Sequence, residues 1–281
     1  MEDKKSNILP EDCISHILSF TSPRAVSISS LVSSIYQSAS ESDVIWEKFL
    51  PSDYQEILSR SVSPVPFSSK KELYFRLCDS ILMDAGLKTF SLEKSTSKKC
   101  YILSARELSI TWGNFPLYWT WKSLPQSRFA EVAELRTICW LEIHGKMNTR
   151  MLSPNTTYAA YLIVKFADRA YGLDSLPADI SVEVRNYHSR GIAYLRRHNN
   201  QKILLEHHCF SNHSNVLNSR GIQGDRRVPS YRNDGWMEIE LGEFFNYGGD
   251  DGDVKMSLRE VKGSHLKGGL IIEGIEVRPK E

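Results

Sequence analysis

The stretch TWGNFPLYWTW, residues 111 to 121, has the residue types of either a packed core segment or a flat binding surface. It contains three tryptophans and two other aromatic residues. Apolar rings usually enter a core, but a core segment seldom interrupts itself with the turn formers Gly113, Asn114 and Pro116. The turn between Trp112 and Trp119 therefore favours an exposed platform on which a flat ligand can stack. Three further tryptophans are expected to pack in the core or on strands: Trp121, Trp140 and Trp236.

Two other clusters contain metal-binding side chains, but neither has the spacing of a metal site. The run LEHHCFSNH contains His207, His208, Cys209 and His213. Adjacent residues of an extended segment point to opposite faces, and this spacing matches no common zinc pattern. The run GGDDGD contains Asp250, Asp251 and Asp253. It lacks the long loop and closing glutamate of an EF-hand. We expect a polar loop and a solvated hairpin turn, with no bound metal.

The sequence contains no recognisable catalytic motif. A nucleophile elbow, a phosphate-binding loop, a zinc-protease helix and a dinucleotide glycine fingerprint are all missing. We therefore expect a protein that is not an enzyme and has no cofactor. The five cysteines are scattered without a CxxC pair, which is typical of reduced thiols in the cytoplasm or nucleus. Cys139 lies in an apolar, strand-like run and is expected to be buried and inert.

Composition indicates an ordinary globular protein. The chain has 281 residues, 41% of them hydrophobic and 25% charged, which is enough for a sizeable core and more than one domain. A net charge of +1 argues against a nucleic-acid binder. The N-terminal segment MEDKKSNILPEDC has no apolar signal region, and no run approaches the roughly 18 apolar residues of a membrane span. We expect no membrane association and a cytoplasmic or nuclear location.

The first ninety residues have helical periodicity. Three short apolar blocks begin near Ile14, Val26 and Val44. Pro10 and Pro23 stand where the first turn of a helix tolerates proline, and the third block ends at a proline. Three such helices bury little by themselves, so we expect a partner surface to complete their core. A Ser/Pro linker follows at residues 59 to 69, and then one amphipathic helix is predicted through Leu73, Leu77 and Ile81, ending near Gly86.

After residue 95 the periodicity changes to that of strands. The segments DISVEVRN, WMEIELGEF and VKMSL alternate apolar and polar residues. Further strand-like runs are 138–143, 158–166 and 270–277. Many short alternating strands with Gly, Asn and Asp turns predict an antiparallel β-sandwich, of jelly-roll type. The polar insert at 196–227 is predicted to be a long loop.

Three consecutive segments near the N-terminus carry a motif: LPEDCISHILSF, TSPRAVSISSLVSS and SDVIWEKFLP. Together they resemble an F-box, the adaptor-binding motif of cullin-RING ubiquitin ligases, over nearly all of residues 8 to 51. The chain departs from that family at Ala25, Ser34 and Gln37. The resemblance implies that a Skp-type adaptor, itself bound to a cullin, covers an apolar face. The matching positions are Leu9, Pro10, Ile14, Ile17, Leu18, Pro23, Val32 and Trp46.

The segments SARELSITWGNFPLYWTW, CWLEIHGKM, DGWMEIELGEFF and KGGLIIEGIEVRP resemble the phloem protein two family of plant lectins over residues 95 to 281. The resemblance implies a β-sandwich that binds N-acetylglucosamine oligomers or the core of N-glycans. In that family a pair of tryptophans seven residues apart binds the sugar, and Trp112 and Trp119 match this pair. An indole offers a broad surface for the C–H face of a pyranose. Polar partners are predicted in four positions: Asn114, Tyr118, Glu240 and Glu243.

These observations predict an α+β, multidomain chain. Residues 1–51 form a three-helix F-box, residues 52–90 a linker and connecting helix, and residues 91–281 the lectin-like sandwich. The leading hypothesis is a substrate receptor of a ubiquitin ligase that captures a glycoprotein client. Two alternatives stay open. One is a free nucleocytoplasmic lectin whose helices are only structural. The other is a receptor whose sandwich recognises a protein surface and no sugar.

Overall fold

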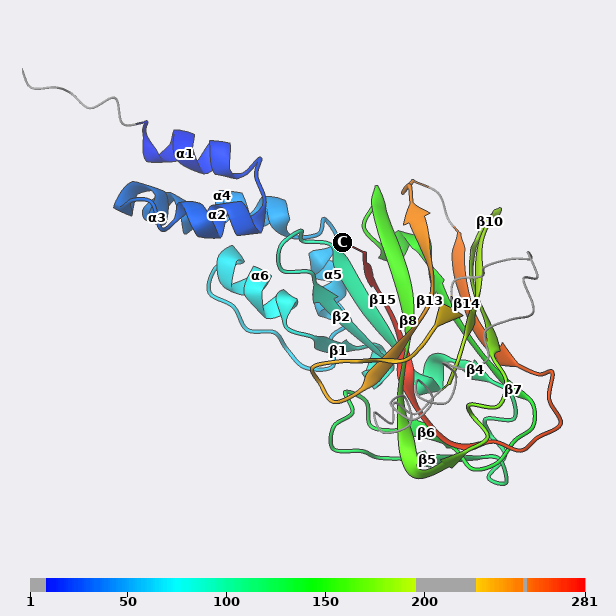
Figure 1. Ribbon diagram of the computed structural model, residues 1–281. Coiled ribbons are helices and arrows are strands. Elements are labelled where there is room, and N and C mark those ends of the chain that lie inside the picture. Colours follow the sequence, from blue (N-terminus) through cyan, green and yellow to red (C-terminus); the bar gives the residue numbers. More distant parts are fainter. Residues whose placement is uncertain (1–8, 196–225, 250–251, 281) are drawn as a thin grey trace, which may run out of the picture.

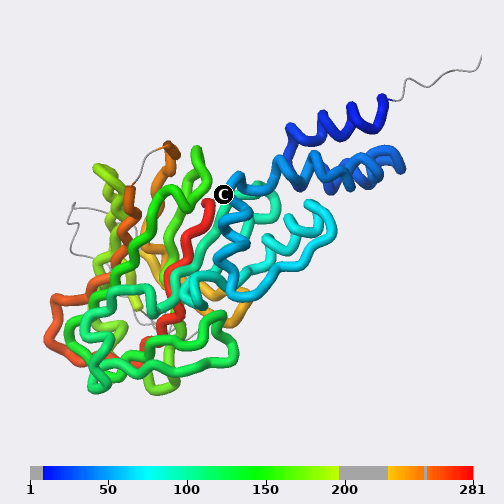
Figure 2. The backbone as a smooth tube through the Cα atoms, turned by 180° about the vertical axis from the view of Figure 1, so that it is seen from behind, coloured from blue at the N-terminus to red at the C-terminus, as the bar shows by residue number. Residues whose placement is uncertain are grey.

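The computed structural model describes residues 9–195, 226–249 and 252–280 of the chain. A helical N-terminal module stands at one end of a β-sandwich (Figure 1), and the view from behind shows the same arrangement (Figure 2). The segments predicted as the histidine-rich loop and as part of the acidic hairpin turn, 196–225 and 250–251, lie outside the described residues. No helix in the described ranges is long and apolar enough to cross a membrane.

The segment that resembles an F-box contains four short helices, whereas the sequence predicts three. They are α1 (Glu11–Leu18), α2 (Pro23–Ser29), α3 (Ser34–Ser40) and α4 (Asp43–Phe49). The second predicted block divides into α2 and α3 because Ser33 acts as an N-cap, with its hydroxyl accepting a hydrogen bond from the Tyr36 N–H at 3.5 Å. Ser22 caps α2 in the same way, accepting from the Ala25 N–H at 3.2 Å. Serine caps therefore set the lengths of these helices.

Two more helices connect this module to the sheet, α5 (Tyr54–Ser59) and α6 (Lys70–Cys78). The predicted helix through Ile81 is wrong at its C-terminal end. The chain becomes extended at Asp79, and Ile81 starts strand β1 (Ile81–Met83), which pairs with β2 (Lys88–Leu92). The sheet therefore begins before residue 90.

The sandwich consists of two sheets, and its strands are antiparallel except for the pair β10 and β11. The first sheet has the order β1-β2-β3-β15-β8-β13-β12, and the hairpin β5-β6 also pairs with β15. Its remaining strands are β3 (Lys99–Ser104), β5 (Trp119–Lys122), β6 (Val132–Leu135), β8 (Thr156–Tyr171), β12 (Ser230–Tyr231), β13 (Met237–Asn246) and β15 (Gly268–Pro279). The predicted strands at 158–166 and 270–277 are thereby confirmed within β8 and β15.

The second sheet has the order β11-β10-β9-β14-β7-β4. Its strands are β4 (Ser109–Ile110), β7 (Leu141–Asn148), β9 (Ala178–Val184), β10 (Tyr187–Ala193), β11 (Arg226–Arg227) and β14 (Asp253–Glu260). Alternate residues of β9 and β14 are buried between the sheets, as the period of two predicts. The predicted strand at 138–143 starts late, because Ile138 makes only an isolated bridge and β7 begins at Leu141.

One hydrophobic core runs from the helices into the sandwich. Trp46 of α4 is 1% exposed, and its ring centroid lies 5.1 Å from that of Tyr74 on α6. The Tyr74 hydroxyl donates to the carbonyl of Lys94 in the β2–β3 turn at 3.0 Å. The Lys99 ammonium on β3 pairs with Asp53 at 2.7 Å. The surface that completes the helical core is therefore provided largely by this chain itself.

A second apolar cluster covers part of the outer face of the first sheet. Trp236 is fully buried against Phe129, Ile163 and Ile271, so the prediction that Trp236 packs is confirmed. The prediction that Cys139 is buried is wrong, because the chain leaves the sheet between β6 and β7 and exposes this thiol. The described cysteines are all free thiols.

Trp46→Ala is expected to lower the free energy of unfolding by about 3–5 kcal/mol, because it removes a buried indole at the junction of α4 and α6. Val44→Ala on the same helix, where the side chain is 58% exposed, is the control and is expected to change it by less than about 0.5 kcal/mol. Chemical denaturation followed by fluorescence and by circular dichroism measures both. Equal effects of the two substitutions would contradict the role of Trp46 as a core residue.

Candidate functional sites

The turn before β5 holds Trp112 in an unusual backbone conformation. The Gly113 N–H donates to the Ile110 carbonyl at 2.9 Å, and Trp112, the third residue of this turn, has φ = +54°. A turn position with positive φ is normally occupied by glycine, because in this conformation a β-carbon lies too close to the following carbonyl oxygen. Strained positions of this kind persist only where surrounding contacts fix them, and they concentrate at functional sites.

Two indoles provide those contacts. The Trp119 N–H donates to the Thr111 carbonyl at 3.1 Å, and the Trp121 N–H donates to the Gly113 carbonyl at 2.9 Å. Hydrogen bonds thus fix the carbonyl groups of the residues before and after Trp112. Trp121 is half-buried, and the Arg106 guanidinium lies 3.6 Å from the centre of its ring, which agrees with its prediction as a packing residue.

Trp119 is 2% exposed and belongs to the common core. The prediction that its ring forms part of an exposed platform is therefore wrong. As the first residue of β5 it points between the sheets, where its ring replaces water contacts with apolar ones. Its place in this structure is to support the turn that carries Trp112.

The exposed part of the turn forms the aromatic platform, which we define as Trp112, Phe115, Leu117 and Tyr118. Trp112 is 42% exposed, and its ring centroid is 5.1 Å from that of Tyr118 at an interplanar angle of 33°. Phe115 and Leu117 are more exposed still, and sequence reasoning did not single them out, although their position in the same turn was visible. Asn114 is exposed in this turn. The platform offers ring faces with polar groups beside them.

Glu240 and Glu243 lie elsewhere. Both are on β13, which is separated from the β5-β6 hairpin by β8 and β15, so the structure does not bring them to the platform. The Lys280 ammonium pairs with Glu240 at 3.2 Å and with Glu243 at 2.8 Å. The prediction of one site containing both glutamates and the tryptophans is wrong for this reason. Spacing along the chain does not determine which strands become neighbours.

Glu240 instead lines a cleft of about 370 Å³ on the outer face of the first sheet. The Arg278 guanidinium lies 3.7 Å from the centre of the Tyr161 ring and donates to Glu238 at 2.7 Å and to Glu276 at 2.7 Å. Burial acts to raise the pKa of Glu238, but the hydrogen bond and charge of Arg278, with Arg232, outweigh it and hold the pKa below its usual range. Such paired carboxylates are poorly suited to accept a proton in catalysis.

The helical module divides the predicted adaptor residues into two groups. Leu9, Pro10, Ile17 and Val32 are exposed. Ile14, Leu18, Pro23 and Trp46 are buried inside the module, so their prediction as contact residues is wrong. A short amphipathic helix buries only one side, and these four residues lie on the buried sides of α1, α2 and α4.

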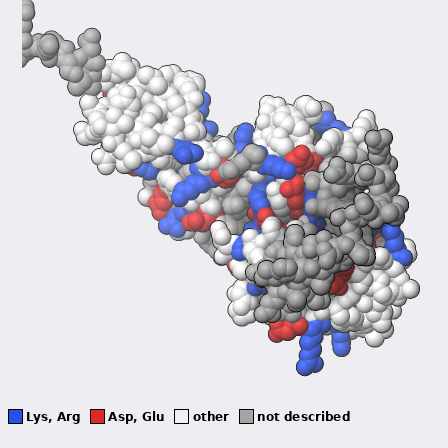
Figure 3. Space-filling model, viewed as in Figure 1, with Lys and Arg blue, Asp and Glu red and all other residues white. Residues whose placement is uncertain are grey.

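Four further exposed apolar residues were missed by the sequence reasoning: Phe20, Ile28, Leu31 and Val44. Leu31 is 84% exposed, the largest value among the exposed large hydrophobic residues of the described chain. The one face of the module that Figure 3 shows is almost free of Lys, Arg, Asp and Glu. We call the exposed apolar residues of the module the apolar face; they are Leu9, Ile17, Phe20, Ile28, Leu31, Val32 and Val44. Exposed apolar patches of this kind mark interaction surfaces.

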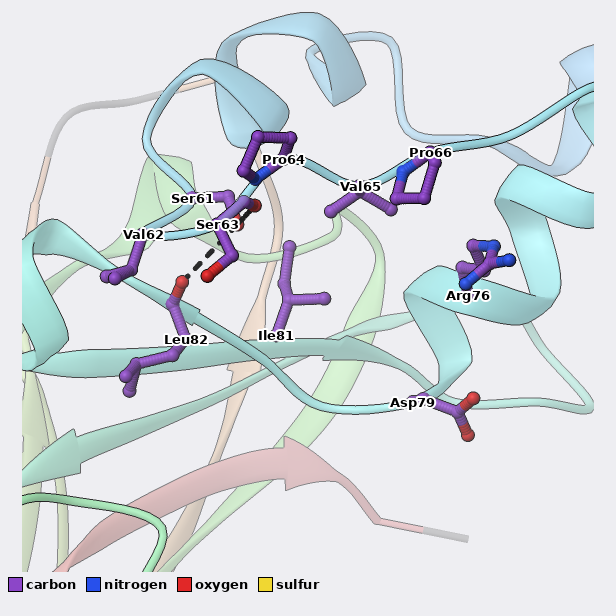
Figure 4. Close-up of a pocket in the computed structure, with 10 residues that line it drawn as sticks. All are labelled: Ser61, Val62, Ser63, Pro64, Val65, Pro66, Arg76, Asp79, Ile81 and Leu82. Carbon is purple, nitrogen blue, oxygen red and sulfur yellow. Dashed lines mark hydrogen bonds between the residues drawn. The ribbon is translucent and has the colours of Figure 1, made fainter.

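A groove of about 300 Å³ lies between the Ser/Pro linker and β1 (Figure 4). Ile81 points toward Val65, and the Val62 N–H donates to the Leu82 carbonyl at 2.9 Å, so the linker pairs with the edge of the sheet. The groove contains none of the predicted site residues. Within the described residues no group of three His, Cys, Asp or Glu side chains could hold a metal ion.

The fold is that of a two-part protein, in which an F-box-type helical module is joined to a lectin-like β-sandwich. Residues 98–279 match the family described as Phloem protein 2. The chain is 50% identical over 279 residues to F-box protein PP2-B15 of Arabidopsis thaliana, covering 97% of this chain and 96% of that protein. It is 48% identical over 279 residues to F-box protein VBF of the same plant, covering 97% and 99%. The chain belongs to the phloem protein 2 family, among the plant F-box proteins that carry this domain.

Trp112→Gly is expected to be more stable than Trp112→Ala by about 0.5–1 kcal/mol in the free energy of unfolding. Both substitutions remove the ring, but only glycine adopts the left-handed backbone without strain. Thermal and chemical unfolding of the two variants measure the difference. An alanine variant as stable as the glycine variant would show that the turn stores no strain at this residue.

Proposed function

We propose that this protein is the substrate receptor of an SCF-type cullin-RING ubiquitin ligase. The helical module binds a Skp-type adaptor, which links the protein to a cullin, and the sandwich captures the client. Other subunits transfer ubiquitin, so this chain positions a client and is not itself an enzyme. The single observation that carries the proposal is the presence of an apolar face and an aromatic platform on different parts of one chain. The compartment that suits this role is the cytoplasm or the nucleus.

The apolar face supports the adaptor part of the proposal. Seven apolar side chains of the module stay exposed although a buried stripe on the same helices already completes the core. Leaving them in water is unfavourable by about 25 cal/mol for each Å² of apolar surface. A partner that covers the face recovers this free energy. The scarcity of charge on the face of the module seen in Figure 3 favours a largely apolar contact there.

The aromatic platform supports the client part. The ends of β4 and β5, which flank the platform, lie at the end of the sandwich remote from the helical module (Figure 1). A client held there and an adaptor held at the module do not compete for space. The exposed Trp112 ring suits the weakly polar face of a pyranose, and we propose an N-acetylglucosamine-containing glycan of a glycoprotein as the ligand.

Replacing Leu31 and Val32 with aspartate together is expected to weaken binding of a purified Skp-type adaptor by about 100-fold or more, because two charges enter an apolar contact. Leu117→Asp is the control, since this leucine is 67% exposed on the sandwich and lies outside the apolar face. Surface plasmon resonance with the full chain measures both. Unchanged adaptor binding by the double variant, or no binding by the wild type, would contradict the ligase proposal.

Trp112→Ala is expected to lower the affinity for N-acetylglucosamine oligomers by about tenfold or more, because it removes the stacking surface. Tyr247→Ala is the control, since this ring is 72% exposed and follows β13 instead of the platform turn. Titration calorimetry of the full chain measures the affinity. Unchanged sugar binding by Trp112→Ala would show that the platform is not the glycan site. No binding of the oligomers by the wild type would favour a sandwich that recognises a protein surface and no sugar.

A further inference from the structure

Trp140 is an exposed indole beside the platform turn that the proposed function does not use. Its side chain is expected from the sequence to pack, but it is 43% exposed, because the residue precedes β7 and leaves the core. The indole N–H of Trp140 donates a hydrogen bond to the Glu142 carboxylate at 3.0 Å. This hydrogen bond fixes one edge of the ring and leaves much of the side chain open to solvent.

Glu142 is the centre of a polar cluster around Trp140. The Arg259 guanidinium lies 2.8 Å from Glu142, and the Nε2 atom of His144 lies 2.9 Å from the same carboxylate oxygen. The Trp140 hydrogen bond lowers the pKa of Glu142 most, burial acts to raise it, and the His144 hydrogen bond and the charge of Arg259 help to hold it below its usual range. The cluster therefore presents an ionised carboxylate, an imidazole and a guanidinium beside an aromatic ring.

These groups belong to the outer face of the second sheet. Cross-strand partners share a face, and on this face His144 of β7 is opposite Ser109 of β4 and Ser257 of β14. The Ser257 hydroxyl lies 2.9 Å from that of Ser181 on β9. A surface rich in hydroxyls and of mixed charge thus continues from Trp140 across four strands. Such a surface offers donors and acceptors to a neutral, hydroxyl-rich ligand.

The platform turn and this face are connected through Thr111. The Thr111 N–H donates to the Glu142 carbonyl at 3.0 Å, and Thr111 directly precedes Trp112. The path from Trp112 to Trp140 runs one residue back to Thr111, across the strand pair to Glu142, and two residues back along the chain. Summing typical α-carbon separations along this path places the α-carbons of Trp112 and Trp140 at most about 16 Å apart. One elongated ligand has the length to contact both indoles.

We propose that Trp140, with Glu142, His144 and Arg259, forms a second carbohydrate subsite that binds an elongated glycan whose other end lies on the aromatic platform. This inference rests on the proposed glycan recognition and adds the part of the ligand that Trp112 does not reach. The exposed indole stacks on one sugar ring. The carboxylate accepts hydrogen bonds from hydroxyl groups, and the guanidinium donates to hydroxyl or acetamido oxygens.

The test compares N-acetylglucosamine oligomers of two and six units on the full chain by titration calorimetry. The wild type is expected to bind the six-unit oligomer more tightly than the two-unit oligomer. Trp140→Ala is expected to lower the affinity for the six-unit oligomer by about five- to tenfold and that for the two-unit oligomer by less than about twofold. Trp140→Phe keeps a ring and is expected to retain most of the affinity for the long oligomer.

Tyr247→Ala serves again as the exposed-aromatic control and is expected to change neither affinity. Thermal unfolding of each variant establishes that the fold is kept. If the wild type binds both lengths equally well, or Trp140→Ala weakens both to the same degree or neither, the second subsite is refuted while glycan recognition at Trp112 stands. If the wild type binds neither oligomer, the glycan part of the proposed function is refuted, and this inference with it.

Discussion

The packing of Trp46 against Tyr74 is the contact on which the two-part structure depends. Helices of seven or eight residues are marginal in water by themselves, and α1 to α4 have that length. The aromatic contact joins α4 to α6, and α6 in turn packs against β2 of the first sheet. The helical module is thus stabilised from the side of the sandwich. Leu31 and Val32 of this module stay exposed to solvent.

The tryptophans of the platform turn show how one short stretch serves both packing and presentation. Trp119 and Trp121 use their N–H groups to hold the carbonyls on either side of Trp112, and Trp112 in return adopts a backbone conformation that is costly for a residue with a β-carbon. The sequence therefore contains three similar rings with different tasks. The question whether this stretch is core or platform has a different answer for each ring.

The sequence predicts well those features that follow from one-sided burial. Strands such as β9 and β14 bury every second residue, and this period of two can be recognised from the order of apolar and polar residues alone. The sequence predicts less well those features, such as helix boundaries and the direction of a side chain, that a single local contact determines. The cap at Ser33 divides a continuous apolar pattern into two helices, and the positive φ at Trp112 turns one ring outward while Trp119 enters the core. The separation of Glu240 from the platform depends on strand order, which no local pattern contains.

The two outer faces of the sandwich differ in a way that favours ligand binding at the second sheet. On the first sheet, Phe129 and Trp236 cover an apolar cluster, and the guanidinium of Arg128 pairs with the buried Glu273 at 2.7 Å. Further along the same face, Arg278 covers the ring of Tyr161. These aromatic and charged groups already have partners within the chain. On the second sheet the ring of Trp140 has much of its surface in solvent, and the hydroxyls of Ser181 and Ser257 are half-exposed. A ligand that needs an open aromatic ring is therefore better served at the end of the second sheet, where Trp140 is 43% exposed, than on the face that carries Glu240.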